Sequence, residues 1–398
     1  MPRFRRRTKV ILAVVALLII VTGGWIYKSV YLSTGSALQR AESFLFSRMT
    51  VAQLGEQGAM RYFYVTNRAM TDDGDELAYR YDATRGSGLK FGVFDTKVEP
   101  RVGLGMFINP SEWFQNEEIR IQKMEALQQE KFVAQVRPLV EASPQQSLLV
   151  VVHGFREAFP SAMRKTAFLG HVLDINSPIL LFDWPGNQGS SLRGYRRARN
   201  VAIESGADLA KALELIVRQI DPKALWIIGN SMGGEVIVNA FSHLYQNPEF
   251  ADTGFEFEDV VLTAPDVSQE EFDNQFKKEI SSMARNLTVY VSSNDRALVM
   301  SRIINRDPRR GESTLNPDML DEAKRVSALI EPGEDLIDLV DVTPVNRTRN
   351  FHNFSLETPE FFDDLYLRLA NDKTPDSRSL YRFQTDEGAN YWVLTPGR

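Results

Sequence analysis

A serine between two glycines is the residue of this sequence best placed to do chemistry. The pentapeptide GNSMG at residues 229–233 directly follows the apolar run ALWII and opens a segment with helical periodicity. A sharp turn between a strand and a helix lifts a serine hydroxyl off a sheet, and glycines keep such a strained turn free of clashes. The N-terminus of the following helix favours negative charge at that point. Ser231 is therefore our candidate nucleophile.

A serine hydroxyl needs a general base, and the chain offers only four histidines. Enzymes with a nucleophile on this kind of turn carry an acid and then a histidine later in the chain. His153 and His171 precede Ser231, and His153 is predicted to be a structural, hydrogen-bonded residue at the end of a buried strand. His243 falls within the helix after the serine and should point away from it. His352, in a loop after the last predicted strand, remains as the base.

The acid that orients the histidine should close a strand between the serine and the base. Asp295 follows the run NLTVYVS, and Asp266 follows the run DVVLT. The later strand, two beyond the nucleophile strand, is the usual position. This favours Asp295 and leaves Asp266 as the alternative acid. Asp338 and Asp341 lie within the last predicted strand and are weaker candidates.

Two backbone N–H groups are expected to form the oxyanion hole. One belongs to Met232, the residue after the nucleophile, and the other to a loop that follows an earlier strand. That loop begins His-Gly-Phe-Arg after the run SLLVVV, so Phe155 is the second candidate. Gly154 would allow the two backbones to approach closely. Trp184, after another strand, could line the pocket or serve in packing.

Alternating strand-like and helix-like segments predict the elements that position these residues. Several strand segments are continuous β-branched and aliphatic runs, which is typical of strands buried on both faces of a parallel sheet. The pattern predicts an α/β fold, with a mostly parallel central sheet flanked by helices and the first two strands at an antiparallel edge. The predicted strands are 61–66, 89–98, 147–152, 178–183, 224–229, 259–263, 286–292 and 336–342, and the predicted helices are 111–133, 206–220, 233–245, 268–284 and 359–371.

The N-terminal region predicts a membrane anchor. Residues 10–27 are uncharged, and as a helix they would span roughly 27 Å, close to the hydrocarbon thickness of a bilayer. Trp25 and Tyr27 fit the far interface, and the basic residues at 3–9 predict an N-terminus inside with the rest of the chain outside. A cleaved signal peptide is the alternative, but a small-residue site such as residues 35–37 lies far beyond the apolar run for cleavage. We expect residues 1–32 to be an uncleaved N-terminal transmembrane helix.

The remainder reads as one domain. Residues 33–58 form a connector, and residues 59–398 form the α/β domain. Residues 296–335 are an insertion between two predicted strands, and such an insertion suits a lid or a solvated helical excursion equally well.

Composition excludes several function classes. The chain has 398 residues, no cysteine and a net charge of −6, and five of its basic side chains lie within the first nine residues. The acidic remainder does not suit nucleic-acid binding, so no nucleic-acid partner is expected. No HExxH motif, no cysteine ligand and no glycine-rich nucleotide motif occurs, so neither a metal nor another cofactor is expected.

An ordered set of short motifs resembles a bacterial family of largely uncharacterised α/β hydrolases of lipase/esterase type. The motifs lie between residues 62 and 354 and read YFYVTNR, LKFGVFDTKVEP, VVVHGF, LLFDWPG, GNSMGG, VLTAPDV, VYVSSNDRAL, LIDLVDVT and FHNFS. The resemblance implies an α/β-hydrolase fold with Ser231, Asp295 and His352 as a triad. Asn230 stands where many relatives have histidine, and Arg156 stands where relatives often have asparagine, so both are expected at the pocket wall.

The leading hypothesis is therefore a membrane-anchored serine hydrolase acting on a small-molecule or lipid ester, either a carboxylic ester or a thioester. An acyltransferase with the same triad and a non-catalytic interaction module on the same fold are the alternatives. The resemblance implies a single-pass protein of the bacterial inner membrane, with a cytoplasmic N-terminus and a catalytic domain facing the periplasm.

Overall fold

The computed structural model describes most of the predicted domain. It describes residues 59–71, 76–98, 119–173, 175–292, 295, 338–346, 354–371, 374–378, 380–384 and 390–395, together with residues 18 and 21. The predicted connector, the 296–335 insertion and His352 lie outside the described residues. So does the predicted anchor, apart from Leu18 and Val21. Within the described ranges, no helix combines the length and apolar character needed to cross a bilayer.

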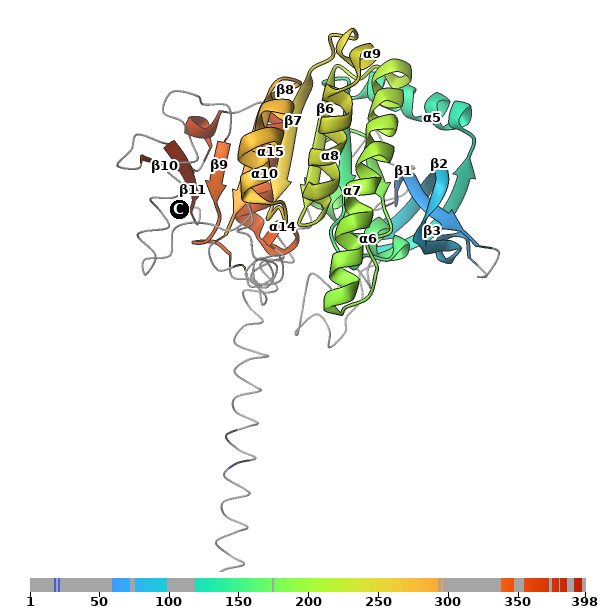
Figure 1. The fold of residues 1–398 in the computed structure, drawn as a ribbon, viewed down its shortest axis with the longest axis horizontal. Coiled ribbons are helices and arrows are strands. Elements are labelled where there is room, and N and C mark those ends of the chain that lie inside the picture. Colours follow the sequence, from blue (N-terminus) through green and yellow to red (C-terminus); the bar gives the residue numbers. More distant parts are fainter. Residues whose placement is uncertain are drawn as a thin grey trace, which may run out of the picture.

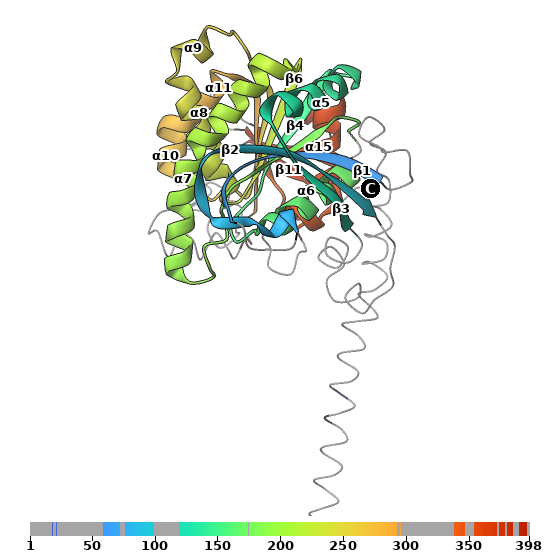
Figure 2. The same cartoon turned by 90° about the vertical axis from the view of Figure 1, so that its right-hand side faces the viewer.

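One sheet organises the described residues, with its strands in the order β10-β11-β9-β8-β7-β6-β4-β5-β1-β2-β3. From β11 to β1 each neighbouring pair is parallel, whereas β10–β11, β1–β2 and β2–β3 are antiparallel. Figure 2 looks onto the β1–β2–β3 edge. The strands are β1 Ala59–Met70, β2 Tyr81–Val98, β3 Ile119–Leu127, β4 Ser147–Val152, β5 Ile179–Asp183, β6 Ala224–Asn230, β7 Phe257–Thr263, β8 Ala284–Val291, β9 Asp338–Asp341, β10 Leu380–Gln384 and β11 Asn390–Leu394.

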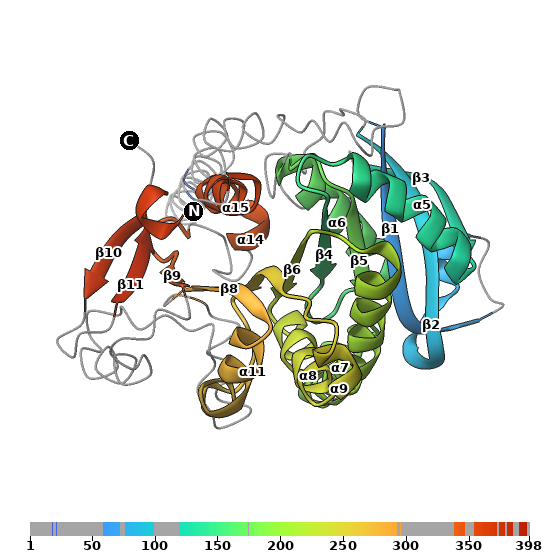
Figure 3. The ribbon, with the colours of Figure 1, turned by 90° about the horizontal axis from the view of Figure 1, so that it is seen from above.

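Helices cover both faces of the sheet (Figures 1 and 3). One face packs against α5 (Gln129–Ala142), α7 (Leu192–Leu215), α8 (Gly233–Tyr245) and α11 (Lys277–Ser281). The other face packs against α6 (Phe159–Leu173) and α15 (Pro359–Asn371), preceded by the short α14 (Phe354–Glu357). The remaining helical pieces are α9 Pro248–Ala251, α10 Gln269–Glu271, π-turns Ile216–Ile220 and Phe272–Phe276, and 3-10 turns Leu77–Tyr79 and Pro375–Ser377.

The alternation of side chains along β6 shows why this sheet is buried on both sides. Leu225 and Ile227 belong to the core against α8, and Trp226 and Ile228 belong to the core against α6 and α15. A strand with apolar residues on both faces needs a layer of helices on each. The predicted α/β class, with its mostly parallel sheet and antiparallel edge, is confirmed.

One secondary-structure prediction is wrong. A surface helix is predicted over 111–133, but residues 119–127 form the strand β3. A helix begins only at Gln129. The segment IRIQKMEAL has helix-forming residues, but β2 is long enough to pair with it from Phe91 to Val98. Lys123 and Glu125 remain exposed on this edge strand, where charged side chains are well tolerated.

Candidate active site

The turn between β6 and α8 is strained at the serine. Ser231 has φ +53°, a left-handed conformation that is costly for a residue with a side chain. Backbone hydrogen bonds hold it there: its N–H donates to Thr263 at 2.9 Å, and its carbonyl accepts from Gly234 at 2.9 Å and from Asp266 at 3.1 Å. The strand–turn–helix predicted for residues 229–233 is therefore present, and the neighbouring strand β7 braces it.

Two glycines allow the backbone to crowd around this turn. A Cβ on Gly233 would lie 2.6 Å from the carbonyl oxygen of Val152, which is backbone and cannot move aside. A Cβ on Gly154 would lie 3.0 Å from the carbonyl oxygen of Asn230 and 3.2 Å from the Cβ of Ser231. The loop after β4 thus lies directly against the serine turn, as the oxyanion-hole prediction requires.

The two predicted oxyanion donors, Phe155 and Met232, flank that contact. Within the described part of the chain, neither backbone N–H donates a hydrogen bond to another backbone group. Met232 is fully buried at the start of α8, and the ring of Phe155 packs edge-on against Tyr195, with centroids 5.6 Å apart. The N-terminus of α8 favours negative charge at this point, and the oxyanion role of the two N–H groups stays a prediction.

The two candidate acids lie at the same edge of the sheet. Asp295 follows β8, two strands from β6, and is only 1% exposed; its backbone N–H donates to the Ser292 carbonyl at 3.4 Å. Asp266 follows β7 and is also buried, and its carboxylate accepts a 2.7 Å hydrogen bond from the hydroxyl of Tyr195. Asp266 thus lies next to the serine turn and Asp295 two strands away, and the choice of Asp295 stays a prediction.

Three of the four histidines are described, and none is placed to serve Ser231. His153 is buried, and its two ring nitrogens contact the Gly154 carbonyl at 2.9 Å and Asp183 at 3.0 Å, so the predicted structural role is confirmed. His243 is exposed in the last turn of α8, the opposite end from the serine. His171 lies near the end of α6. The base predicted at His352 is outside the described residues.

The segment just after His352 is attached to the serine turn. Phe354 is fully buried at the start of α14, and the hydroxyl of Ser355 donates a 3.0 Å hydrogen bond to Oδ1 of Asn230. Thr263 donates to the same oxygen at 3.0 Å. The Asn230 amide therefore joins the ends of β6 and β7 to the C-terminal helices.

A buried arginine that the sequence analysis did not single out organises the neighbouring loops. Arg68, at the carboxyl end of β1, donates to both carboxylate oxygens of Asp183, at 2.6 and 3.0 Å. It also donates to the carbonyls of Glu157 and Trp184 and to the side chain of Asn187, at 2.9, 2.6 and 2.6 Å. The sequence held one signal for this pair: a basic and an acidic residue at the carboxyl ends of two strands. The two ends meet at one edge of the sheet because β1 and β5 are parallel neighbours.

The charge of Asp183 is stabilised by these contacts. Its side chain is fully buried, which by itself raises the pKa of a carboxyl group. The charge of Arg68 and the hydrogen bonds from His153 and Arg68 outweigh this, so the pKa of Asp183 lies below its ordinary value. Trp184, predicted as either a pocket or a packing residue, stacks on His153 and donates from its indole to the His153 carbonyl at 2.8 Å.

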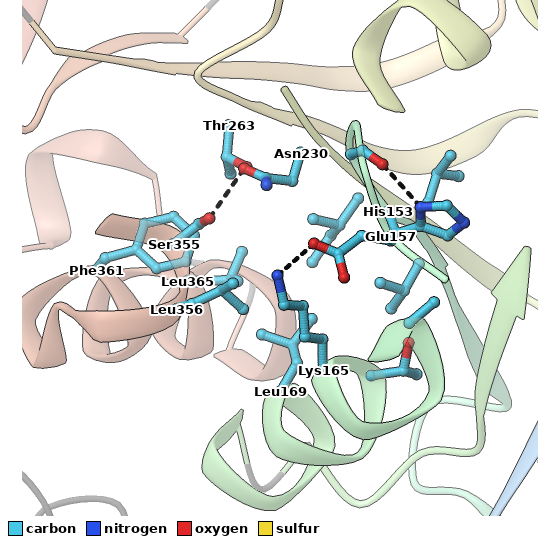
Figure 4. Close-up of a pocket in the computed structure, with 16 residues that line it drawn as sticks. His153, Glu157, Lys165, Leu169, Asn230, Thr263, Ser355, Leu356, Phe361 and Leu365 are labelled. Carbon is cyan, nitrogen blue, oxygen red and sulfur yellow. Dashed lines mark hydrogen bonds and ion pairs between the residues drawn. The ribbon is translucent and has the colours of Figure 1, made fainter. Parts of the chain in front are cut away.

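A pocket opens beside the serine turn on the face covered by α6, α14 and α15 (Figure 4). Its volume is about 530 Å³, including the space at its opening. Asn230 and Gly154 form part of its wall, whereas Arg156 is exposed on the neighbouring loop. Its apolar lining comes from two strands and three helices: Val151, Ile228, Leu169, Leu356, Phe361 and Leu365. We call this the α6–α15 pocket.

Residues 128–365 match the family described as "Alpha/beta hydrolase of unknown function (DUF900)". The chain belongs to this family. The fold of this α/β hydrolase agrees with that assignment, and the resemblance inferred from the short motifs is confirmed. In the described residues, no group of acidic or histidine side chains is arranged to hold a metal ion.

Solved structures of bacterial hydrolases are similar to this chain only at a low level. A proposed cell surface hydrolase from Lactobacillus plantarum WCFS1 has 12% identity and a TM-score of 0.32, with 59% of this chain and 95% of that chain covered. Esterase B from Lactobacillus rhamnosis, solved with a tributyrin phosphonate inhibitor, has 10% identity and a TM-score of 0.28, with coverage of 79% and 94%. A lipase-esterase related protein from Clostridium acetobutylicum ATCC 824 has 15% identity and a TM-score of 0.22, with coverage of 48% and 96%. The search of curated proteins found no match.

Proposed function

We propose that this α/β hydrolase is a serine hydrolase that cleaves ester-type bonds, either carboxylic esters or thioesters. The observation that carries the proposal is the left-handed backbone of Ser231 at the end of β6, φ +53°, held by hydrogen bonds from two neighbouring segments. A strained residue persists only where its surroundings fix it, and such residues concentrate at functional sites. A serine on a strand-to-helix turn of this kind is the arrangement of a nucleophile.

In the proposed reaction, His352 takes the proton of the Ser231 hydroxyl as the oxygen attacks the ester carbonyl carbon. The carbonyl oxygen becomes negatively charged and accepts hydrogen bonds from the N–H groups of Phe155 and Met232. His352 then gives its proton to the leaving alcohol or thiol, and water releases the acyl group in a second, equivalent attack. Asp295 holds the imidazole in the required orientation and stabilises its charged form.

The attachment of Ser355 to Asn230 supports His352 as the base. Ser355 lies next to the serine turn through a 3.0 Å hydrogen bond, and His352 precedes it by three positions.

The membrane anchor is part of the proposal. The uncharged run at residues 10–27, preceded by basic residues, supports an anchored protein with an extracytoplasmic catalytic domain. The expected result is that the protein remains in the membrane after extraction with sodium carbonate, and that externally added protease digests the domain in spheroplasts. Release of the protein into the carbonate supernatant would contradict anchoring.

A fluorophosphonate probe tests the nucleophile. We expect the wild type to be labelled, and Ser231→Ala to lose labelling together with at least about a thousandfold of its activity on p-nitrophenyl butyrate. Ser282→Ala is the matched control, because Ser282 is exposed at the amino edge of the sheet, and it should behave like the wild type. A wild type that takes up no probe, or label that persists in Ser231→Ala, would overturn the proposal.

A further inference from the structure

We propose that the α6–α15 pocket receives the acyl chain of the ester, and that this chain is apolar and of medium length. The inference rests on the proposed role of Ser231 and adds the substrate class. Three observations carry it: the position of the pocket, the state of its polar groups and its closed apolar end.

The pocket and the serine turn share a wall. Gly154 and Asn230, which line the pocket, lie on either side of the closest approach between the β4 loop and the turn. The space that a Cβ would occupy on Gly154 is 3.2 Å from the Cβ of Ser231. Two residues next to Ser231 thus line the pocket, and on the proposed function an acyl group bonded to the Ser231 oxygen extends into it, with its carbonyl oxygen facing the N–H groups of Phe155 and Met232.

Several polar groups of the pocket already have partners. Oδ1 of Asn230 accepts from both Thr263 and Ser355. The carboxylate of Glu157 accepts from Lys165, which forms an ion pair with it (Figure 4), and from the hydroxyl of Ser161. A charged or strongly polar ligand would have to break these contacts, at the cost of unpaired groups in a partly buried site. The pocket therefore selects an apolar group.

Helical side chains close the inner end. Leu365 is fully buried on α15, Phe361 is 1% exposed, and Leu169 on α6 is 5% exposed. These side chains are held in the core that covers this face of the sheet, so they set a fixed limit to the depth. The volume of about 530 Å³ includes open space at the mouth, so the enclosed part is smaller. A butyryl to octanoyl chain suits the enclosed part better than a palmitoyl chain.

Two variants of α6 change the pocket in opposite directions. Ala162 lines the pocket, and Ala162→Leu adds bulk inside it, whereas Leu169→Ala removes bulk from its inner end. Leu173→Ala is the matched control, because Leu173 is buried on the same helix but does not line the pocket. Its truncation should cost comparable stability without changing the space for an acyl chain.

The readout is the ratio of kcat/KM for p-nitrophenyl octanoate to that for p-nitrophenyl butyrate, measured on the full-length protein. Burial of one methylene changes an equilibrium or rate constant about fourfold, so Ala162→Leu should lower the ratio by roughly tenfold or more. Leu169→Ala should shift the preference toward decanoate and longer esters, and Leu173→Ala should leave the ratio unchanged. An unchanged ratio in both pocket variants, or an equal shift in the control, would overturn the assignment of the pocket.

Fluorophosphonate labelling separates this inference from the proposed function. Normal labelling of every variant with no change in chain preference refutes the pocket alone, whereas an unlabelled wild type refutes the nucleophile and the inference with it. A second measurement avoids turnover: titration calorimetry of Ser231→Ala with octanamide, an uncleaved relative of the ester. Binding weakened by Ala162→Leu but not by Leu173→Ala supports the assignment. Binding that is absent, or equally strong in both, contradicts it.

Discussion

Two buried arginine–aspartate pairs stabilise opposite edges of the sheet in different ways. Arg68 and Asp183 lie at the carboxyl edge, where the strands end near Ser231, and both side chains are completely buried. Arg368 on α15 pairs with Asp259, near the start of β7, at 2.6 Å, and these side chains are 3% and 2% exposed. The pairs are alike in chemistry and burial, so their difference lies in what each one connects.

The carboxyl-edge pair connects loops, and the amino-edge pair connects a helix to a strand. Arg68 reaches carbonyl groups in the loops that follow β4 and β5, including that of Glu157, three residues after Gly154. Arg368 donates to Asp259 and so joins α15 to β7. A buried pair adds little to stability compared with apolar residues of the same volume, but it can impose one arrangement on what it connects. We infer that Arg68 positions the loop after β4, which carries the predicted donor Phe155, whereas Arg368 positions the helix α15.

Substitution of Arg68 should produce the largest effect. Arg68→Met leaves Asp183 buried without its guanidinium, which should lower the free energy of unfolding by about 3–5 kcal/mol. Because the loops lose their common donor, kcat should also fall in the molecules that remain folded. Urea unfolding and single-turnover kinetics measure the two effects separately. Arg68→Lys keeps the charge but not the planar fork, and it should retain stability better than it retains kcat.

Arg368→Met should destabilise comparably, by about 3–5 kcal/mol, because it leaves Asp259 without this buried charge partner. Its effect on kcat should be small under conditions in which the protein is folded, since Asp259 is remote from the carboxyl edge. The decisive measurement compares kcat of Arg68→Met and Arg368→Met under conditions in which equal fractions of the two variants are folded. A fall in kcat as large as that of Arg68→Met would show that the edges do not differ as described.

A smaller loss of stability is expected in acid. It comes from His171, which belongs to neither ion pair. Burial lowers the pKa of His171 from 6.5 to about 4. The unfolded chain therefore takes up this proton at a higher pH than the folded protein, and stability falls as the pH drops from about 6.5 towards 4. The loss should be about 2 kcal/mol, less than the full shift implies because the ring is partly exposed. His171→Gln should remove this slope, and the exposed His243→Gln should not.

The smallest effect is expected at the contact between α14 and the serine turn. Ser355→Ala removes a hydrogen bond to Asn230, whose oxygen keeps the one from Thr263, so the free energy of unfolding should fall by only about 1 kcal/mol. If this contact positions the segment that carries His352, kcat should fall severalfold while KM changes little. Ser377→Ala, at an exposed C-terminal turn, is the control, and an equal fall in its kcat would contradict that role.

The strands that are buried on both faces could be predicted from the sequence almost residue by residue. Ser147–Val152 was predicted with its observed bounds, and so were the helices Gly233–Tyr245 and Pro359–Asn371. Long apolar runs and clear helical periodicity leave few alternatives. The serine turn was predictable for a related reason, because two glycines between a strand and a helix satisfy a steric requirement that is local in sequence.

Elements decided by distant partners were not predictable in this way. The segment 119–127 has helical composition, and only pairing with β2 makes it a strand. Strands β10 and β11 were not predicted, since exposed aromatic residues such as Tyr381 and Phe383 gave no clear alternation of buried and exposed positions. The ion pair of Arg68 depends on β1 lying beside β5, which is a property of the topology and not of either segment alone.

The assembly of the pocket wall from distant segments sets the order in which the enzyme can mature during synthesis. The serine turn and its β7 brace are complete once the chain has been made through Asp266, but Ser355, Phe361 and Leu365 follow much later. Chains emerge N-terminus first, at about 5–20 residues per second, so the reactive turn exists for seconds before its apolar compartment can close. Until Ser355 to Leu365 have been made, the growing chain lacks the pocket wall that α14 and α15 supply, so on the proposed function it cannot hold an acyl chain there.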